Sequence, residues 1–148
     1  MPSLTREEAQ ALGRRADRPQ IAPGELLAVS VSGKLVNLAN KKWGWRGVMG
    51  YRTRWKDAVA MALLETGYLP ARGAKVVTFQ ARTARTMDTD GLQASLKPVR
   101  DALVECGVIS GDAPTDGHEF VYEQTVDRAR RGVTIRVRRK SHDPSGAR

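Results

Sequence analysis

Five charged residues between positions 88 and 112 have the types and the spacing to hold a divalent cation beside a phosphate. Asp88 and Asp90 are separated by one residue, Lys97 and Asp101 lie four residues apart, and Asp112 follows a short turn. Alternate residues of an extended chain point the same way, so Asp88 and Asp90 can converge on one ion. Carboxylate oxygens are the ligands that Mg²⁺ prefers, and bound Mg²⁺ keeps waters that a phosphate can displace. The pattern therefore predicts metal-assisted chemistry on a phosphate ester.

A helix is expected to present three of these residues on one face. Residues 91–106 have helical periodicity. At about 100° per residue, Asp90, Lys97 and Asp101 fall within one narrow stripe, opposite the apolar stripe of the same helix. Pro98 removes one helical hydrogen bond, so we expect a kink or a restart there. The polar stripe is in line with the carboxylates that precede the helix.

Each of these residues also has an ordinary structural interpretation. Asp90 would be the N-cap of the helix, since Asp is favoured at that position. Lys97 and Asp101 would form an i,i+4 ion pair on a solvated face. Asp112 would be a turn residue, where Asp is common. On this interpretation the chain is a basic nucleic-acid regulator whose aspartates carry no chemistry.

The charge distribution favours a polyanionic partner and a metal site. The chain of 148 residues has 25 Lys and Arg against 16 Asp and Glu, a net charge of +9. Such a surplus attracts a polyanion, usually a nucleic acid. Residues 88–127 nevertheless contain nine acidic residues and only two basic ones. An acidic island inside a basic protein is suited to hold divalent cations against phosphates.

Basic residues gather in two segments outside this island. Residues 41–56 include six basic residues and no acidic one, and Trp43 and Trp45 stand between them. Bases with interleaved tryptophans suit phosphate contacts and stacking on unpaired bases, and the alternative is that the tryptophans fill the core. Residues 128–140 include seven basic residues and no acidic one. The candidate DNA-binding residues are Asn37, Asn40, Lys41, Lys42, Arg46, Arg52, Arg82, Arg85, Arg130, Arg131, Arg136 and Arg138.

Several other classes of protein do not fit the sequence. Cys106 is the only cysteine, so there is no disulfide framework and no Cys/His cluster for structural zinc. His118 and His142 have no evident triad partners, and the chain has no Walker A or dinucleotide-binding fingerprint. No apolar run approaches the roughly 20 residues of a membrane span, and no signal-peptide core is present. We expect a cytoplasmic protein.

The element pattern predicts one α+β domain, a small mixed α/β unit with a β-sheet packed by two main helices. Residues 1–24 are expected to be an N-terminal appendage with a short helix and a linker, residues 25–140 the domain, and residues 141–148 a flexible tail. The last two strands are expected to form a hairpin with a positive face. The predicted strands are 26–31, 75–82, 120–126 and 133–137, and the predicted helices are 50–65 and 91–106.

The run from Asp88 to Asp112, DTDGLQASLKPVRDALVECGVISGD, resembles the signature of the RusA-type Holliday junction resolvases of bacteria and their phages. That signature is D-x-D-N, a Lys and an Asp four apart on the following helix, and a Gly-Val/Ile turn that ends in a pair of aspartates. The resemblance extends over about residues 25–140. Two positions depart from it: Gly91 stands where the family usually has Asn, and Gly111 where the first aspartate of the pair is expected.

The resemblance implies a small homodimer that cleaves four-way DNA junctions symmetrically with Mg²⁺, or Mn²⁺, held by the motif aspartates. Asp88 and Asp90 match the D-x-D, Lys97 the catalytic lysine and Asp112 the final aspartate, while Asp101 matches the helix aspartate. It implies a metal-dependent endodeoxyribonuclease with metal ligands Asp88, Asp90 and Asp112. The two glycine departures motivate an alternative, a branched- or single-stranded-DNA-binding protein with weak or no catalysis.

Overall fold

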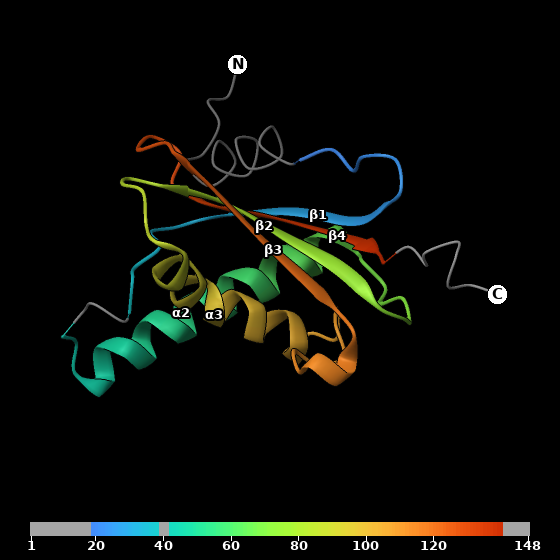
Figure 1. Ribbon diagram of the computed structural model, residues 1–148, viewed down its shortest axis with the longest axis horizontal. Helices are drawn as coiled ribbons and strands as arrows, with labels where there is room; N and C mark the ends of the chain where they lie inside the picture. Colours follow the sequence, from blue (N-terminus) through green and yellow to red (C-terminus); the bar gives the residue numbers. More distant parts are fainter. Residues whose placement is uncertain (1–18, 39–41, 141–148) are drawn as a thin grey trace, which may run out of the picture.

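The computed structural model describes residues 19–38 and 42–140 of the chain. Within these ranges one sheet of four strands packs against two long helices, the α+β architecture that the element pattern predicts (Figure 1). The elements in chain order are β1 (Glu25–Ser32), α2 (Trp45–Thr66), β2 (Lys75–Thr83), α3 (Thr89–Glu105), the 3₁₀ turn η1 (Pro114–Asp116), β3 (Glu119–Val126) and β4 (Gly132–Arg139). Asn40, Lys41, most of the predicted appendage and the predicted tail lie outside the described residues.

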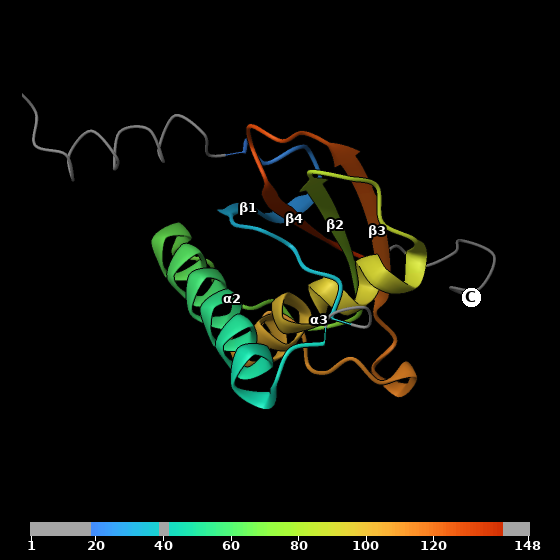
Figure 2. The ribbon, with the colours of Figure 1, turned by 90° about the vertical axis from the view of Figure 1, so that its left-hand side faces the viewer.

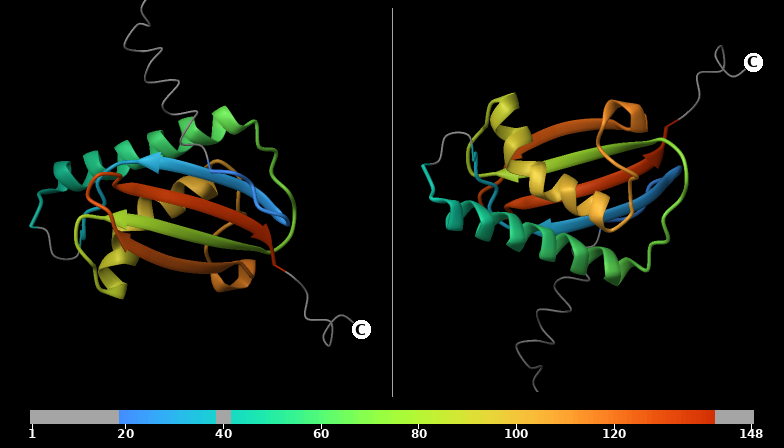
Figure 3. Two further views of the ribbon diagram at one scale, coloured as in Figure 1. Left: turned by 90° about the horizontal axis from the view of Figure 1, so that it is seen from above. Right: turned by 90° about the horizontal axis from the view of Figure 1, so that it is seen from below.

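The sheet has the strand order β1-β4-β2-β3. β4 is antiparallel to both β1 and β2, whereas β3 is parallel to β2. A parallel pair needs a long crossover connection, and α3 provides it between β2 and β3. As a result β1, β2 and β3 all run in the same direction, with β4 opposed to them (Figure 3).

The predicted hairpin of residues 120–126 and 133–137 is wrong, although both strands exist. β4 lies between β1 and β2, and β3 is the edge strand beyond β2. Burial agrees with this order, because β4 is buried on both faces over Val133, Thr134 and Ile135, while β3 is half-buried or exposed throughout. The alternating pattern of each strand identified the strand but carried no information about its neighbour.

Both helices cover the same face of the sheet, and no other helix of the described ranges covers the opposite, open face (Figure 3). The hydrophobic core lies between the two layers. Its fully buried side chains include Val59, Leu96, Val99 and Leu103 from the helices and Val77, Phe79, Ile135 and Val137 from the strands. No helix within the described ranges has the length and apolar character needed to cross a lipid bilayer.

The helices differ from the predicted ones mainly at their ends. α2 begins at Trp45, where Gly44 is its extended N-cap, and not near Gly50. Packing of an apolar face supplies most of a helix's stability, so glycines in the first turns do not prevent it. Gly67 ends α2 in the left-handed conformation, with φ 65°. α3 continues through Pro98 as one helix, so the predicted restart does not occur.

Candidate active site at the carboxyl end of the parallel strands

The carboxyl ends of β1, β2 and β3 lie at one end of the sheet, together with the amino ends of both helices (Figures 1 and 2). Backbone hydrogen bonds join the loops at this end. Gly33 N donates to Arg131 O at 3.1 Å, and Asp127 N donates to Thr83 O at 2.9 Å. In sheets with parallel strands, ligands commonly bind outside the carboxyl ends of those strands. The residues predicted to do chemistry begin at this end.

Asp88 caps α3, so the assignment of the N-cap to Asp90 is corrected. Asp88 Oδ1 accepts a hydrogen bond from Gly91 N at 2.8 Å, and Asp90 is exposed in the first helical turn. The preceding Met87 is fixed to β3, since its backbone N and O bond the side chain of Gln124 at 2.9 and 2.6 Å. Helix amino ends favour carboxylates, so Asp88 has a structural role whether or not it binds a metal.

Asn37 occupies the space beside Gly91. A Cβ added at Gly91 would overlap Asn37 Nδ2, and it would lie 2.9 Å from Asn37 Cγ and 2.5 Å from Asp88 Oδ1. The loop between β1 and α2 thus places an amide next to the Asp88 carboxylate. Amide and carboxylate oxygens are both hard ligands. Gly91 stands where the resolvase signature has an asparagine. The side chain of Asn37, from the loop between β1 and α2, lies beside it.

This close packing makes Gly91 sensitive to substitution. We expect Gly91→Ala to lower the free energy of unfolding by about 1 kcal/mol, because the new methyl displaces Asn37 and weakens the Asp88 cap. Gly50→Ala is the matched control, since a Cβ at Gly50 of α2 meets nothing within 4 Å. It should stabilise the protein by roughly 0.5–1 kcal/mol through helix propensity. Urea unfolding of both variants checks the prediction, which is contradicted if both alanines stabilise equally.

A second cluster lies farther along α3. Lys97 Nζ is 3.5 Å from Asp101 Oδ1 and 4.0 Å from Asp112 Oδ2. Seven helical residues rise about 10 Å, so Lys97 stands about two turns from Asp90. The structure therefore brings Lys97, Asp101 and Asp112 together at this second position. All three side chains are partly exposed, at 58, 33 and 35 % respectively, so these pairs contribute little to stability.

Arg100 is a site residue that the sequence did not single out. Its Nη2 lies 3.3 Å from Asp112 Oδ2 and 3.4 Å from the Asp112 carbonyl oxygen. Its Nη1 donates to Tyr122 Oη at 3.0 Å, and its Cζ is 4.2 Å from the centre of the Phe120 ring. Arg100 therefore links two parts of the fold, the turn that contains Asp112 and the strand β3. The one signal in the sequence was that Arg100 is one of only two bases in the acidic segment.

At the amino end of α3, Asp88 and Asn37 both lie beside Gly91 and offer oxygens that suit Mg²⁺. Asp90 lies in the first helical turn and not in extended backbone, so the expectation that Asp88 and Asp90 point the same way, which holds for an extended chain, does not apply here. Mg²⁺ is often bound by one or two carboxylates together with waters and substrate phosphates. Across residues 19–38 and 42–140, no three His, Cys, Asp or Glu side chains lie close enough together to hold a metal ion. Asp112 pairs instead with Lys97 and Arg100. The structure therefore does not bring Asp88, Asp90 and Asp112 together, and the three-carboxylate site stays a prediction.

Of the twelve candidate DNA-binding residues, six of those that the structure describes are exposed near this end of the sheet. Arg85 lies in the loop between β2 and α3, and Arg130 and Arg131 lie in the loop between β3 and β4. Arg128 joins these loops, because its Nε donates to Ala84 O at 3.3 Å. The other exposed candidates at this end are Lys42, before α2, and Arg46 and Arg52 on α2. Arg138 is also exposed but lies at the opposite end of the sheet, because it pairs with Glu25 and Val76 at the starts of β1 and β2.

Arg82 and Arg136 differ from these residues because they lie on the open sheet face in contacts with the protein itself. Arg82 donates to the Arg130 carbonyl at 2.7 Å and to Thr134 Oγ1 at 2.8 Å. Arg136 forms an ion pair with Glu25 at 2.8 Å. Both guanidinium groups thus hold the sheet face and its loops together, and their role in DNA binding stays a prediction.

No protein-family model matches the chain, and no curated protein matches it closely enough to indicate a relative.

Proposed function

We propose that this protein is a Mg²⁺-dependent endonuclease that resolves four-way DNA junctions by phosphodiester hydrolysis. The observation that carries the proposal is the position of Asp88 and Asp90 at the amino end of α3, at the same end of the sheet as the basic loops that carry Arg85, Arg130 and Arg131. The arrangement offers a cation site and phosphate contacts at the same end of the sheet. The resemblance of residues 88–112 to the resolvase signature supports the same function.

Asp88 and Asp90 would hold the Mg²⁺, with Asp112 as the predicted third carboxylate and Mn²⁺ as a substitute ion. When bound, such an ion supplies Lewis-acid stabilisation of the scissile phosphate and lowers the pKa of a water. The side chain of Lys97 is 58 % exposed. Its ammonium group would lie near the scissile phosphate and stabilise the negative charge that develops there in the transition state. Arg100 would keep Asp112 and Lys97 within reach of each other. Asn37 would orient the Asp88 carboxylate.

The basic loops would hold the DNA arms by phosphate contacts, which recognise branched shape and not sequence. A two-fold homodimer would offer two equivalent sites to the two symmetric strands of a junction. The protein would then act in the cytoplasm of a bacterium or of a phage-infected bacterium. Sedimentation of the protein with and without a junction measures the predicted dimer.

Phosphate contacts predict a salt dependence that specific variants should change. The Arg85→Ala/Arg131→Ala double variant should reduce the slope of log K against log salt by about 2, roughly 1 for each lost phosphate contact. Arg72→Ala is the control, because Arg72 is exposed just before β2 and so lies at the other end of the sheet. Its slope should equal that of the unmodified protein. If the slope of log K against log salt falls equally in both variants, the salt dependence reflects total charge, and the proposed phosphate contacts of Arg85 and Arg131 are contradicted.

The second candidate function is junction binding without cleavage. It is favoured by one observation, the pairing of Asp112 with Lys97 and Arg100, which leaves Asp88 and Asp90 as the only carboxylates of the motif at the start of α3. Incubation of a synthetic four-way junction with the purified protein separates the two functions. The endonuclease yields paired, symmetric nicks in Mg²⁺ or Mn²⁺. Tight junction binding with intact strands in both metals identifies the binding protein.

A further inference from the structure

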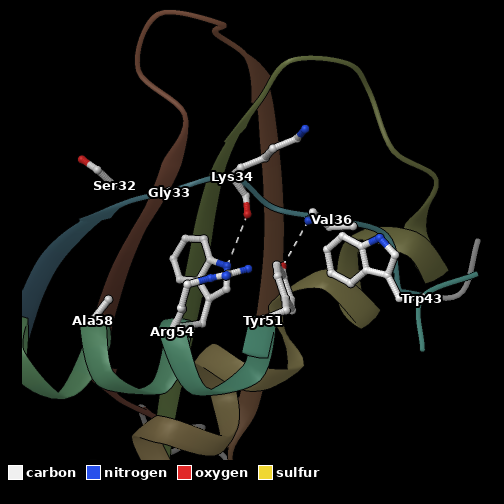
Figure 4. Close-up of a pocket in the computed structure, with 9 residues that line it drawn as sticks. Ser32, Gly33, Lys34, Val36, Trp43, Tyr51, Arg54 and Ala58 are labelled. Carbon is white, nitrogen blue, oxygen red and sulfur yellow. Dashed lines mark hydrogen bonds between the residues drawn. The ribbon is translucent and has the colours of Figure 1, made fainter. Parts of the chain in front are cut away.

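A pocket of about 490 Å³ lies between the loop that follows β1 and the first half of α2 (Figure 4). Trp43, Tyr51 and Trp55 form its aromatic part, and Lys34 and Arg54 are its charged residues. The remaining lining residues are Ser32, Gly33, Val36 and Ala58. A pocket of this volume with aromatic walls and few polar groups has the usual character of a ligand site. The proposed catalytic residues are not among its lining residues.

The buried aromatic residues fix the shape of the pocket. Tyr51 Oη donates to Ser95 O of α3 at 2.8 Å and accepts from Val36 N at 3.1 Å. Burial raises the pKa of Tyr51 to about 12, so the hydroxyl remains a donor at neutral pH. Trp55 Nε1 donates to Lys34 O at 3.3 Å. With their polar atoms satisfied, Tyr51 and Trp55 serve as rigid walls.

Trp43 is the wall that remains accessible. It is half-buried, and its ring lies 6.0 Å from that of Tyr51 in an edge-to-face arrangement. Tyr51 also lies edge-to-face against Trp55, with 6.5 Å between ring centres, so its ring contacts both tryptophans. Trp45, by contrast, is 76 % exposed and is not among the residues that line the pocket, so the alternative that both tryptophans fill the core is wrong for Trp45.

The charge of the lining identifies the class of ligand. Lys34 and Arg54 are both exposed and cationic, and none of the described residues that line the pocket is acidic. A planar aromatic group with an attached phosphate matches an aromatic wall beside two cations. Every nucleobase has a π-face that can stack on an aromatic side chain, and this kind of stacking tolerates any base sequence.

Two sets of contacts link the pocket to the proposed active site. Val36 lines the pocket, and the next residue, Asn37, packs against Gly91 and Asp88. Tyr51 also joins the pocket to α3 through Ser95. A nucleotide seated in the pocket would therefore have a defined position relative to the first turn of α3.

We propose that this pocket receives one unpaired base of branched DNA, stacked on Trp43, with the adjoining phosphate held by Lys34 and Arg54. The proposal rests on the proposed function in that it takes DNA as the partner, but it does not require cleavage. It gives the protein a way to recognise the strand exchange point, where bases are free to leave the stack. Base extrusion is least costly where pairing is already lost.

Two fluorescent duplexes that differ in one group test the proposal. Both carry a single-nucleotide bulge, with adenine in one and an abasic site in the other, and binding is measured in EDTA so that no strand is cut. We expect the full chain to bind the adenine bulge about tenfold more tightly, within the range of one base–aromatic stack. Trp43→Ala should reduce this ratio to below about twofold, and Trp43→Leu, which keeps apolar volume for packing, should do the same.

Two controls accompany these variants. Trp45→Ala should keep the tenfold ratio, and Arg54→Ala should weaken binding to both duplexes by a similar factor. The base pocket is overturned if the unmodified protein shows no preference, or if either Trp43 variant retains it while folded by circular dichroism. Junction cleavage by the same preparation then shows whether the endonuclease proposal stands without it. Failure to bind either duplex or a junction overturns both proposals.

Discussion

Asp88→Asn and Asp90→Asn are each expected to reduce junction cleavage at least a hundredfold, while junction binding is retained or slightly strengthened. Loss of a preorganised group at the reacting centre typically costs roughly 100- to 1,000-fold, and a neutral amide neither balances the metal's charge nor repels phosphate. The Asp88 variant should keep its stability, because Asn caps helices about as well as Asp and can accept the hydrogen bond from Gly91 N that Asp88 accepts at 2.8 Å. Strand cleavage and binding of a labelled junction provide the two readouts.

Asp57→Asn is the matched control, because Asp57 is an exposed carboxylate on α2 that has no assigned role. It should cleave at the rate of the unmodified protein. Unchanged cleavage in the Asp88 and Asp90 variants would support the structural interpretation, in which the aspartates only cap the helix and form turns. Asp88→Ala should additionally lower the free energy of unfolding by about 1 kcal/mol, since it removes the cap.

Phe79→Ala is expected to lower the free energy of unfolding by about 3–5 kcal/mol. Phe79 is fully buried in β2, and its ring stacks on Tyr122 at 5.2 Å and on Phe120 at 6.4 Å between ring centres. Truncation leaves a cavity between the sheet and α3. Tyr122 also accepts the hydrogen bond from Arg100, so the same cavity should loosen the support of the Asp112 turn. Urea unfolding measures the loss, a large fraction of the stability of an ordinary domain.

Val126→Ala gives the comparison for a position outside the core. Val126 is at the end of the same edge strand as Phe120 and Tyr122 and is 51 % exposed. Its substitution should change the free energy of unfolding by less than about 0.5 kcal/mol. Equal losses for Phe79→Ala and Val126→Ala would mean that the β2–β3 side of the sheet is not packed as described.

The strands and helices were predictable because each has a clear period. Val133, Ile135 and Val137 alternate with polar residues, and β4 forms over this segment. The pairing of β4 was not predictable in the same way, because a period of two identifies a strand and a buried face but not a neighbour. Thr134 points to the face opposite Val133 and Ile135, and its burial is typical of a central strand. Burial is a property of the assembled sheet and cannot be taken from the pattern of one strand.

The candidate site was predictable only in part for a related reason. The position of Asp88 and Asp90 at a strand-to-helix junction follows from local pattern, and the structure confirms that junction. Two features depend on contacts between segments that are distant in the sequence: Asn37 beside Gly91, and Arg100 on Asp112. The choice of Asp88 as the cap is local, but it depends on the residue at which α3 begins. Spacing along one helix does not reveal which side chain a later turn will bring back to it.

The central claim is that Asp88 and Asp90, with Asp112 as the predicted third ligand, hold a hard cation against the DNA. Mn²⁺ titration followed by electron paramagnetic resonance, with the protein bound to a non-cleavable junction, tests it most directly. We expect tight Mn²⁺ binding by the unmodified protein, and a loss in Asp88→Asn and Asp112→Asn that is at least as large as the roughly 10- to 100-fold typical for an outer-shell partner. Equal Mn²⁺ affinity in all three proteins would contradict the claim.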